Sequence, residues 1–182
     1  MKSVKMNYET AVFGGGCFWC LEEIFLQITG VKSVESGYAG GFTEKPSYKE
    51  ICSGETGHAE VIKIEFDPGI VSYDQLLEVF FYIHDPSTLN RQGNDIGEQY
   101  RSVIIFTSAK QEKTARTFIN NLKNDKKYPK PIVTEIEPLD KFYRAEDYHQ
   151  KYFSSNPSQP YCQLIISPKI KKFREKFAGL LK

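Results

Sequence analysis

The sequence lacks any long hydrophobic run. No stretch approaches the ~18 consecutive apolar residues that suggest a membrane span, and Met1 to Asn7 contain no hydrophobic core of a secretory signal. The sequence also has no excess of charge of one sign, because its formal net charge is only +1. We therefore expect a cytoplasmic protein with no membrane or nucleic-acid partner.

Several familiar ligand-binding motifs are also absent. The glycine cluster at 14–16 has no third glycine at the spacing of a dinucleotide fingerprint, since Trp19 stands there, and no phosphate loop follows it. Only Cys17 and Cys20 form a close pair, whereas a zinc site usually needs two such pairs. The three histidines have no ligand spacing, so we predict neither a metal nor another cofactor.

Cys17 lies where the sequence predicts a turn from a strand into a helix. The apolar run at 11–13 indicates a buried strand, and the glycines after it permit a tight turn. One face of the following segment is apolar, at Leu21, Ile24, Phe25 and Ile28. Free N–H groups at the start of that helix favour an anion, so we expect a Cys17 pKa below the reference of ~8.5.

Cys20 follows on the same helical side, within reach of a disulfide with Cys17. A Cys-x-x-Cys between strand and helix also fits a thioredoxin-like disulfide exchanger. Phe18 and Trp19 argue against that, because they would fill the groove where a disulfide partner docks. They suit a pocket for a small apolar group beside the sulfur. A buried cysteine pair among core aromatics is the alternative without chemistry.

Glu60 conflicts with the pattern of its own strand. The segment 60–67 alternates, and Glu60 has the parity of the apolar residues Ile62, Ile64 and Phe66. A carboxylate that faces the core is costly unless it is paired, hydrogen-bonded or protonated, and burial raises its pKa. A structural ion pair, or an end residue turned back to water, is the other interpretation.

The chain shows no internal repeat or long linker, so we predict one catalytic domain over residues 1–182. A surface loop is expected at 40–57 and a shorter helix at 145–153. Capping boxes at Ser72 and Ser108 predict two further helices. The remaining predicted elements are strands at 31–38, 103–106, 132–137 and after Cys162, and a last helix from Ser167. This order favours an α+β two-layer sandwich, a mixed sheet with helices packed on it.

Four blocks, in this order, resemble the A-type peptide methionine sulfoxide reductases: Gly16-Cys17-Phe18-Trp19, Gly54 to Glu60, Asn94 to Ser102, and Glu146 to Gln150. The resemblance runs from about Ala11 to about Ile166. It implies a ferredoxin-like fold and reduction of the S-epimer of methionine sulfoxide, free or in proteins. It also implies thioredoxin as the reductant. We expect the protein to be a monomer.

The resemblance implies a role for each site residue. Cys17 is the nucleophile, and Glu60 is the acid that protonates the oxygen. Tyr48 and Tyr100 hold that oxygen. The residues that bind the rest of the substrate are Phe18 and Trp19, which form the pocket for the methyl group, and Asp95, which positions the substrate. His149 and Cys52 are assigned no catalytic part.

The chain departs from the family pattern in its second thiol. Many members have glycine at position 20 and a glycine-rich tail with recycling cysteines, whereas this chain has Cys20 and an ordered-looking segment after Cys162. Either thiol can condense with a Cys17 sulfenic acid, and we favour Cys20. A peroxide-sensing switch that uses a Cys17–Cys20 disulfide is the alternative function.

Overall fold

The computed structural model describes residues 7–124 and 127–182. The segment 1–6, in which the sequence shows no signal core, lies outside the described residues. The described part contains a mixed six-stranded sheet of order β7-β6-β1-β3-β2-β8, in which only β6 and β7 run parallel. Its strands are β1 (Glu9–Gly14), β2 (Val31–Ala39), β3 (Ala59–Phe66), β6 (Val103–Phe106), β7 (Glu135–Pro138) and β8 (Phe142–Arg144).

Helices and short connecting elements complete the fold. The α-helices are α1 (Phe18–Leu26), α2 (Tyr48–Ser53), α3 (Tyr73–Ile83), α4 (Ala109–Asn124), α5 (Tyr152–Ser155) and α6 (Ser167–Lys176). The others are the hairpin β4 (Arg91–Gln92) and β5 (Asp95–Ile96), the 3-10 turns η1 (Glu98–Tyr100), η2 (Asp147–His149) and η4 (Ala178–Leu180), and the π-helical η3 (Cys162–Ile166). This mixed sheet with packed helices confirms the predicted α+β class.

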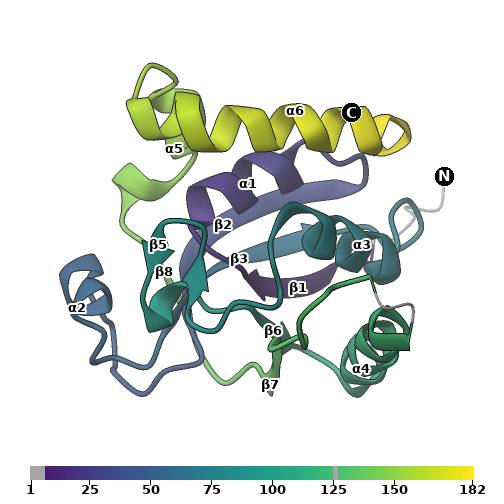
Figure 1. Cartoon of the computed structure of the whole chain (residues 1–182), viewed down its shortest axis with the longest axis horizontal. Coiled ribbons are helices and arrows are strands. Elements are labelled where there is room, and N and C mark those ends of the chain that lie inside the picture. The colour runs from purple at the N-terminus through teal and green to yellow at the C-terminus, as the bar shows by residue number, and fades with distance from the viewer. Residues whose placement is uncertain (1–6, 125–126) are drawn as a thin grey trace, which may run out of the picture.

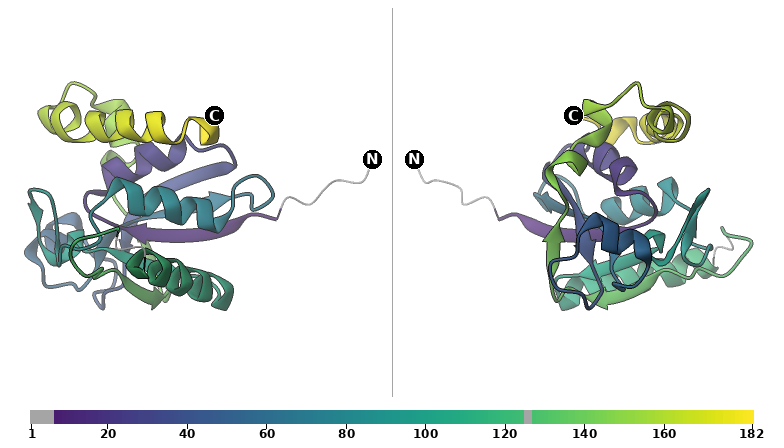
Figure 2. Two further views of the ribbon diagram at one scale, coloured as in Figure 1. Left: turned by 45° about the vertical axis from the view of Figure 1, so that its right-hand side comes forward. Right: turned by 90° about the vertical axis from the view of Figure 1, so that its left-hand side faces the viewer.

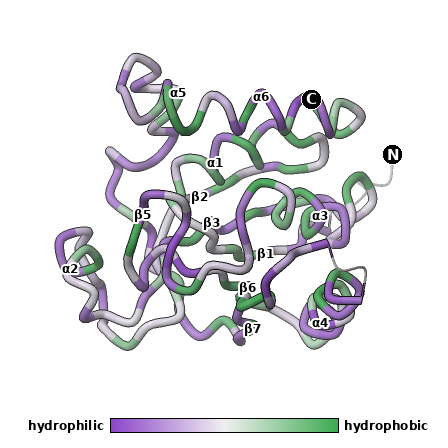
Figure 3. The backbone as a smooth tube through the Cα atoms, in the orientation of Figure 1, coloured by the Kyte–Doolittle hydropathy of each residue, from purple (hydrophilic) through white to green (hydrophobic). Residues whose placement is uncertain are grey.

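Strand alternation divides the interior into two cores. Ile62, Ile64 and Phe66 of β3 belong to the larger core, together with apolar side chains of α1, α3, α4 and α6. Val61 belongs to a smaller cluster on the opposite face. Figure 1 shows α6 lying over α1, and Figure 3 shows the alternation of apolar and polar turns along α4 and α6. The parity predicted for Glu60 therefore directs it toward the larger core.

The chain segments around Cys17 gather at one end of the sheet. Strand β1 runs toward this end, and α1 starts there, at the left of Figure 1. Helices α2 and α5, strand β8 and the β4–β5 hairpin surround it, and this side faces the viewer in the right-hand view of Figure 2. Segments that are far apart in sequence are thus brought together around the start of α1.

The long loop predicted at 40–57 is wrong in part, because it contains α2. Ser47 accepts a hydrogen bond from the backbone N–H of Glu50, and the Glu50 side chain accepts one from the Ser47 N–H. This capping box starts α2, and Gly54 in a left-handed conformation (φ 76°) ends it. The predicted helix at 145–153 is also interrupted: Lys151 has φ 52°, which separates η2 from α5.

The strand predicted after Cys162 is wrong. Residues Cys162–Ile166 form a π-helix that continues directly into α6. A run of apolar, partly β-branched residues resembles a strand in sequence, but in the described structure it is helical and pairs with neither edge strand of the sheet, β7 or β8. Cys162 is therefore held, fully buried, in a continuous helical segment. No helix among the described residues is long and apolar enough to cross a bilayer.

We predict that Phe13→Ala costs about 3–5 kcal/mol in unfolding free energy. Phe13 is fully buried in β1, stacks on Phe80 at 4.9 Å between ring centroids, and lies 5.9 Å from Phe25. Urea denaturation measures the loss. Leu89→Ala is the control, because Leu89 is 68% exposed and its change should stay within about 0.5 kcal/mol. Equal effects of the two substitutions would contradict the position of the core.

Candidate active site

The turn before Cys17 depends on a glycine with positive φ. Gly16 has φ 91°, and a Cβ there would lie 2.7 Å from Cγ of Gln92, so both the conformation and the space exclude a larger residue. Cys17 itself is extended and is the N-cap of α1. This confirms the predicted strand–turn–helix arrangement and places the thiol at the free N–H groups of the helix.

Glu60 occupies the same helix start. Its Oε2 accepts a hydrogen bond of 3.2 Å from the backbone N–H of Phe18, the first residue of α1, and only 2% of the residue is exposed. Burial raises the pKa of the Glu60 carboxyl to about 8, and the charge of Asp95 acts in the same direction. The Phe18 bond opposes this rise. The prediction that Glu60 is buried with a raised pKa is confirmed.

The lowered pKa expected for Cys17 is wrong for this resting state. Burial raises the pKa of the Cys17 thiol well above its ordinary value, and the charge of Glu60 adds to the rise. The backbone N–H of Trp19 acts in the opposite direction but is the weaker effect. Desolvation therefore outweighs the helix terminus, and Cys17 rests as a thiol.

The two aromatic residues after Cys17 lie against different neighbours. Phe18 is buried, with its ring centroid 5.0 Å from that of His149. Trp19 is partly exposed and stacks on Tyr152 of α5 at 3.7 Å, with the two rings nearly parallel. Tyr161 approaches the Trp19 ring edge-on at 6.0 Å. Together these rings form an aromatic wall beside the sulfur.

His149 fixes the orientation of the Trp19 indole. Indole Nε1 donates a hydrogen bond of 3.0 Å to Nδ1 of His149, so Nδ1 carries no proton and the neutral ring is protonated at Nε2. Burial lowers the pKa of His149, which favours this neutral form. Within the described chain Nε2 has no hydrogen-bond partner, and it lies 3.9 Å from Oε2 of Glu146.

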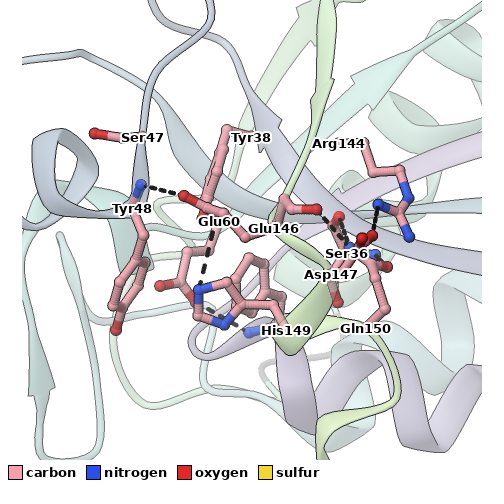
Figure 4. A network of polar contacts seen from close by, with 12 residues as sticks. Ser36, Tyr38, Ser47, Tyr48, Glu60, Arg144, Glu146, Asp147, His149 and Gln150 are labelled. Atoms are coloured by element: carbon pink, nitrogen blue, oxygen red, sulfur yellow. Dashed lines mark hydrogen bonds and ion pairs between the residues drawn. The ribbon is translucent and has the colours of Figure 1, made fainter.

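Glu146 connects this aromatic wall to the predicted oxygen-binding residues. Its carboxylate accepts hydrogen bonds of 2.8 Å from the Tyr38 hydroxyl and from the backbone N–H of Tyr48 (Figure 4). The second bond fixes the first residue of α2. The Tyr48 ring in turn contacts His149, with centroids 4.5 Å apart. One carboxylate thus holds α2 and β2 around the same site.

The charge of Glu60 acts on the phenols of both Tyr48 and Tyr100, so these side chains lie near the carboxyl. Burial is the main cause that raises the pKa of each phenol, and the charge of Glu60 adds to both. Both hydroxyls therefore remain protonated hydrogen-bond donors near neutral pH. For Tyr100, Cys17 and Asp95 contribute in the same direction. Of the predicted site residues, these two phenols, the thiol and the acid are brought together.

Asp95 and Tyr161 form the other side of the site. The Tyr161 hydroxyl donates a hydrogen bond of 2.6 Å to Oδ2 of Asp95. Cys17 and Asp95 both raise the pKa of Tyr161, after burial, so the pair lies close to the thiol. Asp95 comes from the short β5 strand, whereas Tyr161 directly precedes η3.

The remaining cysteines differ in their accessibility. Cys20 is 4% exposed, and burial raises its pKa to about 11, although the charge of Lys169 lowers it. Cys162 is fully buried, and burial raises its pKa too. Cys52 of α2 is exposed. No disulfide joins these thiols in the described chain.

Comparison with known proteins shows the family of the chain. The family model described as peptide methionine sulfoxide reductase matches residues 9–180. A curated relative from Trichodesmium erythraeum (strain IMS101), named peptide methionine sulfoxide reductase MsrA, is 55% identical over 93% of this chain and 96% of its own length. The chain belongs to the peptide methionine sulfoxide reductase family. It is accordingly an oxidoreductase of the kind that reduces methionine sulfoxide.

Solved structures of this family share the fold. Methionine sulfoxide reductase A of Corynebacterium diphtheriae superposes with a TM-score of 0.80 at 36% identity, over 87% of this chain and 79% of the other. Reduced Mxr1 from Saccharomyces cerevisiae gives 0.78 at 34% identity, over 88% and 94%. The architecture of the chain is therefore that of the peptide methionine sulfoxide reductases.

Three residues of this reductase site were not predicted from the sequence: Glu146, His149 and Tyr161. Glu146 and His149 lie in a segment whose sequence resembles a short amphipathic helix, and the hydrogen bonds that give them importance cross more than 90 residues. The sequence signal for them was the block Glu146 to Gln150, which is one of the four that carry the family resemblance. Tyr161 carried no separate signal.

We predict that His149→Phe lowers the unfolding free energy by about 1 kcal/mol or more, because the partly buried indole N–H of Trp19 loses its acceptor. Trp19 is the only tryptophan, so its fluorescence reports this bond, and its emission should shift to shorter wavelength. Tyr152→Phe, which preserves the stacked ring, is the control. Unchanged emission in His149→Phe would refute the contact.

The same bond should depend on pH. The lowered pKa of His149 means that the folded state favours the neutral ring, so the stability it contributes is present above ~6.5 and is lost as the pH falls below that value. Trp19 emission of the unsubstituted protein should therefore change on acidification below about pH 6.5. In His149→Phe this change should disappear; its persistence would assign it to another group.

Proposed function

We propose that this chain reduces the S-epimer of methionine sulfoxide, in proteins or as the free amino acid, with Cys17 as nucleophile and Glu60 as acid. One observation carries the proposal: a fully buried carboxyl with a pKa of about 8 adjoins the thiol at the start of α1. Oxide is a very poor leaving group, so reduction of a sulfoxide needs a proton on the oxygen. A carboxyl that keeps its proton at neutral pH supplies it.

The protons of this step balance when Cys17 rests as a thiol. Glu60 gives its proton to the sulfoxide oxygen while the sulfur of Cys17 attacks the sulfoxide sulfur, so that a sulfur–sulfur bond forms and the proton of the Cys17 thiol passes to Glu60. The sulfoxide S–O bond and the new S–S bond then break as the OH group moves to the Cys17 sulfur. The sulfoxide sulfur gains two electrons and leaves as methionine, and the Cys17 sulfur loses two electrons and becomes a sulfenic acid. No proton is consumed overall, so a raised Cys17 pKa does not prevent this step.

The surrounding residues take the other parts. Tyr48 and Tyr100, which keep their hydroxyl protons, donate hydrogen bonds to the oxygen as negative charge develops. Phe18 and Trp19 enclose the methyl group on sulfur, and Asp95 positions the substrate. The orientation of Trp19 through His149, and of Tyr48 through Glu146, supports these assignments because both residues are held before substrate binds.

Regeneration requires a second thiol. Attack on the Cys17 sulfenic acid forms a disulfide and releases water, and an external dithiol, which we assign to thioredoxin, reduces that disulfide. We assign the attack to Cys20, which lies in the first turn of α1 with its N–H on the Cys17 carbonyl at 3.2 Å. Lys169 lowers its pKa in part. Cys162 would have to leave a buried helical position.

We predict that the two epimer assays give opposite results. The purified protein with dithiothreitol should reduce blocked methionine-S-sulfoxide, and the R-epimer should remain unchanged. Chromatography of the two separated epimers measures this directly. Turnover of the R-epimer alone, or oxidation of the thiols by peroxide without turnover of either epimer, would reject the proposed function.

Glu60→Gln should slow the single-turnover release of methionine by about 100-fold or more, because the amide cannot donate the proton. In the unsubstituted enzyme the same rate should be level below pH 8 and fall above it, as Glu60 loses its proton; the variant should show no such fall. Glu22→Gln is the matched control, since Glu22 is a second buried carboxyl, with a pKa raised by burial to about 7. Its variant should keep the fall above pH 8.

Cysteine variants separate the two sulfur roles. Cys17→Ser should abolish the release of methionine, whereas Cys20→Ser should release about one methionine per enzyme and then stop with thioredoxin as reductant. Cys52→Ser is the control and should turn over fully, because Cys52 is exposed and serine keeps a hydrogen-bonding group beside the Tyr48 phenol. Full thioredoxin-driven turnover in Cys20→Ser, lost instead in Cys162→Ser, would transfer the resolving role to Cys162.

A further inference from the structure

A groove of about 450 Å³ adjoins the candidate site, between the β4–β5 hairpin and the helical segment η3–α6. Its volume lies within the ~300–1,000 Å³ that ligand sites usually have. Neither the acid nor the methyl pocket uses it. The residues of its lining that matter below are Asp95, Tyr161, Leu164, Ile165 and Lys169.

The groove and the thiol share one wall. Tyr161 and Asp95, joined by their 2.6 Å hydrogen bond, line the groove on one side. On the other side they lie near Cys17, since the charge of Asp95 raises the pKa of Cys17 and Cys17 raises that of Tyr161. A chain that brings a methionine sulfoxide to Cys17 must therefore place its neighbouring residues at or next to this groove.

The chemistry of the lining selects among possible neighbours. Leu164 is 74% exposed, an unusual position for a large aliphatic side chain, and together with Ile165 it supplies an apolar floor. Lys169 is the cation of the groove, and within the described residues it forms no ion pair with a carboxylate. The carboxylate of Asp95 already accepts from Tyr161. An anionic side chain that reaches Lys169 would therefore gain a partner.

We propose that this groove binds the residue that flanks the oxidised methionine in a polypeptide substrate, and that Lys169 gives it a preference for an acidic side chain there. The inference rests on the proposed reduction of methionine sulfoxide and adds its substrate class. The free amino acid has no flanking residue and leaves the groove empty. A polypeptide fills both the groove and the aromatic pocket, so it is the better substrate.

The test compares two peptides that differ only in the residue next to methionine-S-sulfoxide, which is Glu in one and Lys in the other. With dithiothreitol as reductant, kcat/KM should favour the Glu peptide, and Lys169→Glu should change the ratio by about threefold or more toward the Lys peptide. Taking the ratio within each variant cancels any effect of Lys169 on the recycling of Cys20. Lys171→Glu is the matched control, because Lys171 is exposed on the same helix and does not line the groove.

A second variant tests the apolar floor. Leu164→Ser removes an exposed side chain, so the fold should tolerate it, and it should lower kcat/KM for both peptides relative to blocked methionine-S-sulfoxide. An unchanged peptide ratio in Lys169→Glu would overturn the proposal. If KM for thioredoxin also rises in that variant, the groove binds the reductant instead of the substrate. If the unsubstituted protein does not reduce blocked methionine-S-sulfoxide at all, the proposed reduction itself is rejected.

Discussion

The hydrogen bond from the Phe18 backbone N–H to Glu60 holds the site together. It joins the start of α1 to β3, and therefore the thiol to the acid, across 42 residues of sequence. A buried carboxyl without a partner would be costly, and a fully ionised one more so. One N–H donor together with a retained proton satisfies the group without driving its ionisation. The bond therefore fixes the position of Glu60, while burial outweighs the bond and keeps the pKa of the carboxyl raised.

Burial affects the pKa values of the site residues more strongly than the start of α1 does. The start of α1 favours anions, yet burial raises the pKa of both Cys17 and Glu60. The result is a pair that rests with both protons in place, which suits a reaction that takes no proton from solvent. Around this pair, the phenols of Tyr48 and Tyr100 are kept protonated by the same burial.

Local patterns in the sequence were enough to predict much of this arrangement. The alternation along β3 predicted the inward Glu60, and the glycines with the following apolar face predicted the strand–turn–helix around Cys17. Capping boxes predicted α3, where Ser72 and Gln75 exchange bonds. At α4 the box is only half formed, because Gln111 bonds the backbone N–H of Thr107 instead of that of Ser108. Such signals concern residues within one or two turns of each other.

The errors have a common physical cause. The π-helix after Tyr161 resembled a strand because a short apolar run does not by itself distinguish a strand from a buried helical segment. The Cys17 pKa depends on the depth of burial, which the helix-start pattern does not contain. Glu146 and His149 act through contacts with Tyr48 and Trp19 that only the folded chain creates. The helix α2 is the exception, since Ser47 and Glu50 carried its signal in the sequence.

The protonation state of Glu60 in the resting enzyme is the claim on which the rest depends. It can be measured directly by following the carboxyl carbon of Glu60 in a ¹³C-glutamate-labelled sample by NMR as a function of pH, with the Glu60→Gln spectrum to assign the signal. The account predicts a midpoint near pH 8. A midpoint near the ordinary glutamate value of ~4.3 would mean that Glu60 is ionised at neutral pH and cannot be the acid.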